Sequence, residues 1–302
     1  KGFYGVLKSA DEDIQFTLLT GVTKFSQVSI FSDLNHLSDI SMTEDYATLC
    51  GLTQNEIETN LAPEIETLAQ KTNTTIAETL ELIKKWYNGY RFELDCEGVY
   101  NPFSTLQALG KCKIDNYWFQ SGTPTFLLDI LEKFEKPVDE FENITVSGSA
   151  FREIDPDKIG ALPILYQAGY LTLKEAGPFR DTYVLDYPNF EVRDSLLQHI
   201  LCRFANLDFA EQSSSLTKML VALYENDLDT MFKNLQVLFK KIPSQIHIPL
   251  EAYYHSLFYM VFELVAGKIE AETNYADGRS DAVIHTPDRI FIFEFKFNKS
   301  SK

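Results

Sequence analysis

Residues 289–297 read Arg-Ile-Phe-Ile-Phe-Glu-Phe-Lys-Phe, so that phenylalanine occupies every second position. This alternation predicts a β-strand, because successive side chains of a strand point to opposite faces of a sheet. The phenylalanines share one face, and the other face carries Ile290, Ile292, Glu294 and Lys296. Because the isoleucines make this second face apolar, we expect it to be buried. Charges on a buried face are costly unless they are paired or bind a metal.

The segments before this run predict the rest of a small sheet. Strands are expected over 269–274 and 281–285, and each is followed by a turn that contains Gly, Pro or Asp. Asp281 opens the second of these strands. The alternation along the strands is expected to place Asp281 and Glu294 on one face of the sheet.

A helix with one apolar face is predicted before the sheet. Its apolar residues are Leu250, Tyr253, Tyr254, Leu257, Phe258, Val261 and Leu264. At about 100° per residue, Glu251 lies at the edge of this stripe, and His255 lies one turn later on the same edge. Glu251 can therefore reach a site beside the core, and His255 is a possible supporting group there, although such a histidine is more often structural. Glu263 points the other way and should face water.

These acidic residues suit a divalent metal. Asp281, Glu294 and Glu251 supply the hard oxygen ligands that Mg²⁺ or Mn²⁺ prefers. A metal of this kind holds a phosphate oxygen and lowers the pKa of a bound water. Lys296 can position that water or stabilise developing negative charge. We therefore predict Asp281, Glu294 and Lys296 as catalytic residues. An alternative stays open, in which Glu294 and Lys296 are a solvated pair and Asp281 is a turn residue.

The same residues resemble a known signature. Asp281, preceded by Gly278-Arg279-Ser280, and Glu294-Phe295-Lys296 resemble the D…ExK pattern of the PD-(D/E)XK nuclease superfamily. Glu251 is similar to the acidic residue that many members place before the sheet. The resemblance implies a restriction-endonuclease-like αβββ core over 249–302. Because that fold normally continues with a helix and a strand after ExK, we expect the domain to be incomplete at Lys302.

The amino-terminal residues carry a second apolar run. Residues 14–20, Ile-Gln-Phe-Thr-Leu-Leu-Thr, predict a strand buried on both faces, as in a parallel sheet. Residues 18–26 resemble the fourth core strand of AAA-type P-loop ATPases, where a polar residue at the strand end senses the γ-phosphate. The resemblance makes Thr20 or Lys24 that sensor. An ordinary exit from strand to loop explains the same residues equally well.

Three aromatic segments extend this resemblance over nearly the whole chain. They are Trp86-Tyr-Asn-Gly-Tyr-Arg-Phe92, Val99-Tyr-Asn-Pro-Phe103 and Tyr117-Trp-Phe-Gln-Ser-Gly-Thr123. They resemble the lid of AAA-ATPase-like proteins fused to a C-terminal PD-(D/E)XK domain, which implies a bacterial intracellular protein. No GxxxxGK[ST] loop occurs in the 302 residues, so we expect no ATPase activity from them and ATP binding only in a longer protein.

The middle of the chain predicts helices and one hairpin. Thr53 and Glu56 form a capping-box pattern, and Pro102 begins a helix. Further helices are expected at 76–87, 126–134, 216–224 and 228–239. A helix from Asp155, a hairpin over 170–185 and a helix over 191–204 follow the order of a winged-helix module, whose role is more often structural than DNA-binding.

We therefore expect a multidomain chain of α/β and α+β parts. Its predicted segments are an ATPase-core remnant over 1–45, a helical lid over 46–140, a winged-helix-like module over 141–205, a helical connector over 206–248 and the truncated nuclease-like domain over 249–302. The boundary near 140 rests on the polar, turn-rich stretch 137–149. No apolar run approaches the about 20 residues of a membrane helix. The scattered Cys50, Cys96, Cys112 and Cys202 predict reduced thiols and a cytoplasmic protein.

Two functions remain open. The leading one is metal-dependent hydrolysis of nucleic acid, DNA rather than RNA, controlled by nucleotide binding in a longer protein. The other is a nucleotide-switched regulator whose nuclease fold only binds. The net charge of −17 favours the regulator, because neutralising phosphates needs Lys and Arg. The set Asp281, Glu294 and Lys296 favours the enzyme. Oligomeric state is left open.

Overall fold

The computed structural model describes residues 6–7, 9–21, 38–121, 142–149, 161–241, 257–265, 273–275, 280–285 and 288–295. The chain forms two compact units. The first comprises residues 1–123 and 142–192, and the second comprises 124–141 and 193–302. The five-segment division given above stays a prediction. No helix among the described residues is both long and apolar enough to span a membrane.

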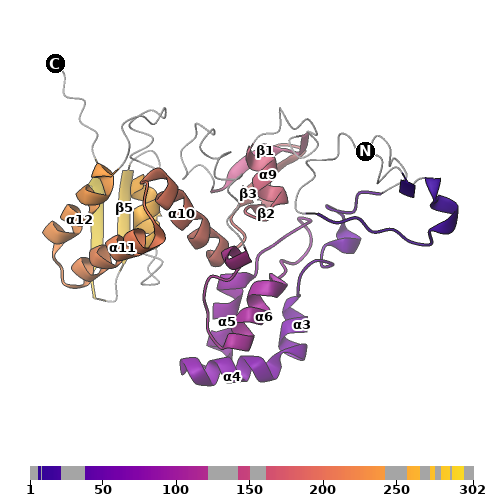
Figure 1. Cartoon of the computed structure of the whole chain (residues 1–302), viewed down its shortest axis with the longest axis horizontal. Coiled ribbons are helices and arrows are strands. Elements are labelled where there is room, and N and C mark those ends of the chain that lie inside the picture. The colour runs from indigo at the N-terminus through magenta and orange to yellow at the C-terminus, as the bar shows by residue number, and fades with distance from the viewer. Residues whose placement is uncertain are drawn as a thin grey trace, which may run out of the picture. The chain divides into compact units, whose positions relative to one another are not determined.

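Four helices form the lower part of the first unit in Figure 1, and short 3-10 helices flank them. The α-helices are α3 (Gln54–Asn60), α4 (Ala62–Thr72), α5 (Ile76–Tyr87) and α6 (Pro102–Lys111). The 3-10 helices are η1 (Asp11–Asp13), η2 (Glu44–Tyr46) and η3 (Trp118–Ser121). The predicted starts of α3, α5 and α6 are confirmed. The helix predicted at 126–134 lies outside the described residues.

Capping explains where these helices begin. Thr53 accepts a hydrogen bond from the Glu56 amide, and the Glu56 carboxylate accepts one from the Thr53 amide at 2.8 Å. The predicted capping box is therefore confirmed. Thr75 and Glu78 form a second box at the start of α5, with the matching amide bond at 2.7 Å. Each box satisfies amide groups that a helix leaves without intrahelical partners.

Helix, hairpin and helix follow in the predicted order, and the boundary between the two units falls within the second helix, after Val192. They are α9 (Ala161–Gln167), β2 (Thr172–Ala176), β3 (Thr182–Asp186) and α10 (Phe190–Phe204). A further strand, β1 (Ile144–Ser147), pairs antiparallel with β3 and gives the sheet order β1-β3-β2. The polar stretch 137–149 was predicted to contain a domain boundary; the two units divide after residue 141, and β1 begins three residues later. An edge strand can be polar because half of its side chains face water.

The three aromatic segments meet inside the first unit. Tyr90 and Val99 pair as an isolated β-bridge, which joins the first segment to the second. The Tyr87 hydroxyl donates to the Asp115 carbonyl at 3.0 Å and accepts from the Asp115 amide at 3.1 Å, next to the third segment. These segments therefore hold the helices against one another, a structural role that the resemblance alone did not specify.

Glu191, at the start of α10, connects this helix to the third aromatic segment. Its carboxylate accepts hydrogen bonds from the amides of Tyr117 at 2.6 Å and Trp118 at 2.9 Å, and the residue is fully buried. Burial raises the pKa of Glu191 above its ordinary value, although the two amide donors oppose the shift. The carboxylate thus ties the third aromatic segment to the first turn of α10.

The strand predicted over residues 14–20 is wrong. These residues form neither helix nor strand, and Phe16, Leu18 and Leu19 are 80%, 56% and 40% exposed. An apolar run becomes a strand only where neighbouring strands receive its backbone hydrogen bonds. None of the described strands pairs with this segment.

The second unit contains helices and an antiparallel sheet. Its elements after α10 are α11 (Phe209–Tyr224), α12 (Leu228–Lys240), a helix over 257–265, β4 (Thr273–Tyr275), β5 (Ser280–His285) and β6 (Ile290–Phe295). The strand order is β4-β5-β6. The helices predicted at 216–224 and 228–239 and the last two predicted strands are confirmed.

All four cysteines are free, as predicted, and burial raises the pKa of Cys202 to about 11.

One expectation about the helix over 257–265 is wrong. Glu263 was expected to face water, but it is 6% exposed and its carboxylate lies 2.6 Å from Arg193 Nη2. Arg193 also donates to the Tyr259 hydroxyl at 3.2 Å. The helix is covered on both sides, so its polar position must be paired with a charge from α10.

We predict that Glu191→Ala lowers the free energy of unfolding by about 3 kcal/mol, because two buried amides lose their acceptor. Glu191→Gln keeps an acceptor oxygen and should cost less than about 1 kcal/mol. The raised pKa means that the folded state favours the protonated acid, so wild-type stability falls as pH rises above about 4.5. Urea unfolding should therefore show that the free energy of unfolding of Glu191→Gln rises relative to that of the wild type between pH 4.5 and pH 7. If the difference in unfolding free energy between the two proteins stays the same over this pH range, the account is contradicted.

A second prediction concerns the buried ion pair. Glu263→Ala should lower the free energy of unfolding by about 3–5 kcal/mol, because Arg193 keeps its charge and loses its partner. The exposed pair Lys241–Glu211, at 2.9 Å, is the matched control, and Glu211→Ala should cost less than about 1 kcal/mol. Equal losses in the two variants by urea unfolding would show that burial of the Glu263 carboxylate has no energetic consequence.

Candidate metal centre

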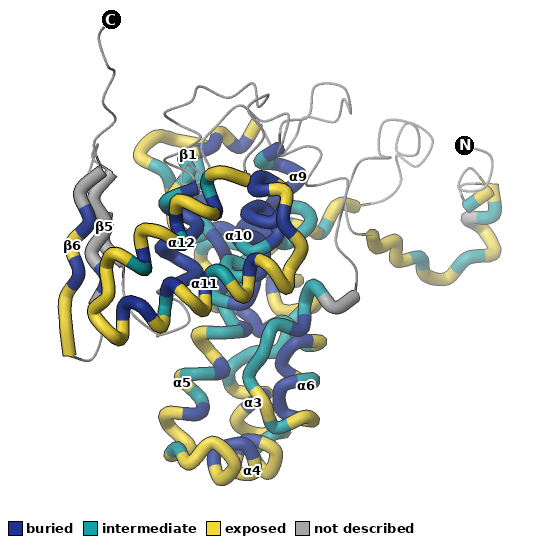
Figure 2. The backbone as a smooth tube through the Cα atoms, turned by 60° about the vertical axis from the view of Figure 1, so that its left-hand side comes forward, coloured by how far each residue is buried: buried dark blue, intermediate teal, exposed yellow. Residues whose placement is uncertain are grey.

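The alternation along β6 separates a buried face from an exposed one. Phe291 and Phe293 are 7% and 5% exposed, whereas Ile290 and Ile292 are 62% and 74% exposed (Figure 2). The predicted alternation is confirmed, but the expected burial of the isoleucine face is wrong. An antiparallel sheet can leave one face in water when helices cover only the other.

Aromatic contacts explain which face is covered. The Phe293 ring lies 4.6 Å from the Phe262 ring and 6.0 Å from the Phe232 ring, measured between centroids. Phe262 belongs to the helix over 257–265, and Phe232 belongs to α12. Ile284 of β5 is fully buried as well. The phenylalanine face of β6 is therefore the core face of this sheet.

The register of the hairpin determines how the candidate carboxylates are placed. β5 and β6 pair antiparallel, and Asp281 and Glu294 are direct Cα partners. Directly opposed positions lie on the same face of a sheet, with Cβ atoms roughly 4.5–5.5 Å apart. Glu294 is two positions from Ile292, so both acidic positions belong to the isoleucine face. Two carboxylates at this spacing can offer oxygens to one cation.

The exposed face changes the electrostatic argument for this pair. Because Ile290 and Ile292 are exposed, the argument that a charge on a buried face needs a metal or a counter-charge no longer applies to this face. Two like-charged positions directly across a ladder still repel, and a shared cation would offset that repulsion. The case for a metal thus depends on the register and on the chemistry of the donors. The open face would also give a large substrate access.

The other predicted site residues are less well determined. Glu251, His255, Lys296 and Lys24 lie outside the described residues. Thr20 is exposed and belongs to the irregular segment before Gly21. Within the described ranges, no group of three or more His, Cys, Asp or Glu side chains could hold a metal ion. The structure therefore pairs two of the three predicted ligand positions and leaves the third undescribed.

Arg289 is a positioning residue that sequence reasoning missed. Its Nη1 donates to the Tyr224 carbonyl at 3.1 Å, at the last residue of α11. A cation at the carboxyl end of a helix interacts favourably with the helix dipole and its free carbonyls. Arg289 thereby attaches the start of β6 to the helical layer. A lone arginine before a strand gives no sequence signal for such a contact.

Comparisons with known proteins support the nuclease-like assignment at this end of the chain. Residues 250–302 match the family model described as PD-(D/E)XK nuclease superfamily. The chain is also 33% identical, over 98% of its length, to an "Uncharacterized protein in vnfD 5'region" from Azotobacter chroococcum mcd 1. It spans 56% of that relative. No solved structure matches the chain. The family model thus supports a PD-(D/E)XK nuclease superfamily domain at residues 250–302, the part of the chain that contains the paired Asp281 and Glu294.

Proposed function

We propose that the carboxy-terminal domain is a metal-dependent nuclease that hydrolyses phosphodiester bonds, with DNA as the favoured substrate. The observation that carries this proposal is the direct pairing of Asp281 with Glu294 in a segment that matches the nuclease superfamily. Asp281, Glu294 and Glu251 are the proposed ligands of Mg²⁺ or Mn²⁺. Such an ion, when bound, neutralises a phosphate oxygen and makes water more acidic.

Each side chain has a distinct proposed role. The Asp281 and Glu294 carboxylates hold the ion from adjacent strands, and Glu251 adds a ligand from the preceding helix. Lys296 is two positions after Glu294, so an extended strand would put both on one face. Its ammonium orients the attacking water or stabilises charge on the phosphate as the bond breaks. His255 is proposed as a supporting group beside the metal ligands.

The proposed control of this activity lies in the longer protein. The chain spans 56% of the length of the curated relative that it matches. No phosphate-cradling loop occurs in the 302 residues of the chain. We propose that an AAA-ATPase-like module binds ATP outside these residues and gates the nuclease. The first 45 residues would be the remnant of that module, with Thr20 or Lys24 as its sensor, and the winged-helix-like part would be structural.

A regulator without catalysis is the second candidate. The net charge of −17 and the exposed Ile290 and Ile292 favour it, since an apolar exposed surface beside the carboxylates suits binding of another protein. The two candidates differ in one measurable property, which is cleavage of nucleic acid by the full-length protein.

Plasmid nicking by the full-length protein, with Mg²⁺ or Mn²⁺ and with or without ATP, tests the proposed function. Asp281→Ala should abolish both cleavage and metal binding. Lys296→Ala should lower the cleavage rate about 100-fold or more while metal binding is retained, because the lysine acts on transition-state charge. Asp288→Ala is the matched control, since this exposed acid lies in the turn before β6.

Three outcomes would separate the alternatives. Absence of cleavage of both DNA and RNA under all these conditions would replace the enzyme with the regulator. Cleavage by Lys296→Ala at the wild-type rate would refute the catalytic lysine and leave the metal ligands standing. If Asp288→Ala loses as much cleavage and metal binding as Asp281→Ala, the effect comes from the removal of any negative charge near the site and not from the loss of a metal ligand.

A further inference from the structure

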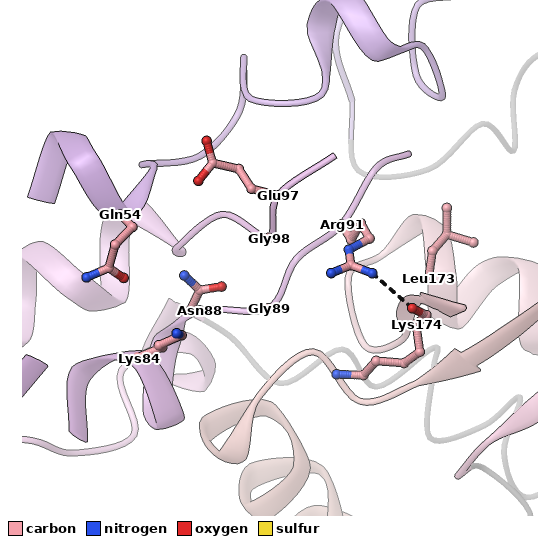
Figure 3. A pocket seen from close by; sticks show the side chains of 9 residues that line it. All are labelled: Gln54, Lys84, Asn88, Gly89, Arg91, Glu97, Gly98, Leu173 and Lys174. Atoms are coloured by element: carbon pink, nitrogen blue, oxygen red, sulfur yellow. Dashed lines mark hydrogen bonds between the residues drawn. The ribbon is translucent and has the colours of Figure 1, made fainter. Parts of the chain in front are cut away.

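A cationic pocket lies in the first unit, in a part of the chain that the nuclease proposal does not use. Its volume is about 360 Å³, within the range of small-molecule sites. It opens where the turn after α5 passes β2. In Figure 3, Gln54, Lys84 and Asn88 lie on one side of the pocket, and Arg91 and Lys174 lie on the other.

The charge of this pocket is opposite to that of the chain. Lys84, Arg91 and Lys174 line it, and Glu97 is the one acidic residue of its lining. Glu97 is exposed, so water screens its charge. The amides of Gln54 and Asn88 add uncharged polar groups. Three of the nine lining residues are Lys or Arg, against 27 of the 302 residues of the chain.

Arg91 is held in a fixed position. Its backbone amide donates to Thr172 Oγ1 at 2.7 Å, and its Nη1 donates to the Lys174 carbonyl at 2.9 Å. Its buried Nε has no hydrogen-bond partner among the described residues. The hydrogen bond from Nη1 holds the guanidinium beside the pocket, so this cation would lose little conformational entropy when an anion binds there.

Lys174 is a partly desolvated cation of the pocket. Its side chain is half-buried, and its ammonium has one hydrogen bond within the described residues, to the Pro188 carbonyl at 3.4 Å. Burial lowers the pKa of Lys174, and the nearby Arg91 lowers it further, while Asp186 opposes the shift. A bound anion would offset the cost of keeping this ammonium charged in a partly dry position.

Two glycines shape the floor of the pocket. Gly89 has φ +116°, and a Cβ at this position would lie 2.0 Å from the Pro188 carbonyl oxygen. A Cβ on Gly98 would lie 3.0 Å from Asn88 Oδ1. Gly89 therefore requires glycine for the close approach of the backbone, whereas a side chain at position 98 would crowd the Asn88 side chain. The Asn-Gly-Tyr-Arg sequence that begins at Asn88 thus forms the pocket as well as the fold of this unit.

We propose that this pocket binds the phosphate group of a small phosphorylated ligand or free phosphate, with Lys84, Arg91 and Lys174 as its cationic contacts. A phosphate dianion suits three cations better than a single carboxylate does, because its charge and its several oxygens can engage all three. The pocket contains neither Asp281 nor Glu294, and the proposal does not depend on the nuclease activity.

Isothermal titration of the 302-residue chain with inorganic phosphate, pyrophosphate and ATP, at constant ionic strength, tests the proposal. Inorganic phosphate or pyrophosphate should bind at one site. Lys84→Ala should weaken this binding about 10-fold, since it removes one charged contact. Lys84 is exposed on the last turn of α5, so its replacement leaves the fold intact. Lys71→Ala, on the last turn of α4, is the matched control and should change the affinity less than twofold.

The arms of the titration also identify the source of the phosphate. Tighter binding of ATP than of pyrophosphate, lost in Lys84→Ala, would make a nucleotide the ligand, whereas equal or weaker ATP binding would assign the site to small phosphates. Lys174→Met provides a second variant, and circular dichroism establishes that it is folded. Absence of heat with all three probes, or wild-type affinity in both Lys84→Ala and folded Lys174→Met, would overturn the proposal.

Discussion

The register between β5 and β6 is the constraint on which the candidate metal centre depends. A shift of one residue would move every side chain of β6 to the other face and separate Asp281 from Glu294. Packing resists that shift, because Phe291 and Phe293 are buried and Phe293 contacts rings from α12 and the helix over 257–265. The apolar core on one face of the sheet thus sets the positions of the acidic pair on the other.

The two units are stabilised by buried carboxylates in different ways. Glu191 accepts two backbone amides and connects an aromatic segment to α10, whereas Glu263 pairs with Arg193. These partners account for the burial of both acids within the fold. The register assigns the positions of Asp281 and Glu294 to the sheet face on which Ile290 and Ile292 are exposed. Access for a large substrate requires such an opening.

Local signals in the sequence predicted much of the fold. The Thr53–Glu56 box and the alternation of side chains along the strand depend on a few neighbouring residues, so they could be predicted directly; the box is confirmed, and the alternation is confirmed over 290–293. Burial depends on tertiary partners, which the sequence does not specify, and two predictions about burial were wrong. The apolar run 14–20 is exposed, and Glu263 is buried. The pocket at Arg91 and Lys174 could not be predicted, because its walls are about 80 residues apart in the chain.

Binding of Mn²⁺ to the 302-residue chain tests the central claim most directly. Loss of the free-ion signal in electron paramagnetic resonance would measure it, with Asp281→Asn and Glu294→Gln as nearly isosteric variants and Asp288→Asn as control. The account predicts one site in the wild type and in Asp288→Asn, and at least about 10-fold weaker binding in the other two variants, since each loses a charged oxygen ligand. Equal affinity in Asp281→Asn and the wild type, or no binding by the wild type, would contradict a metal held by this pair.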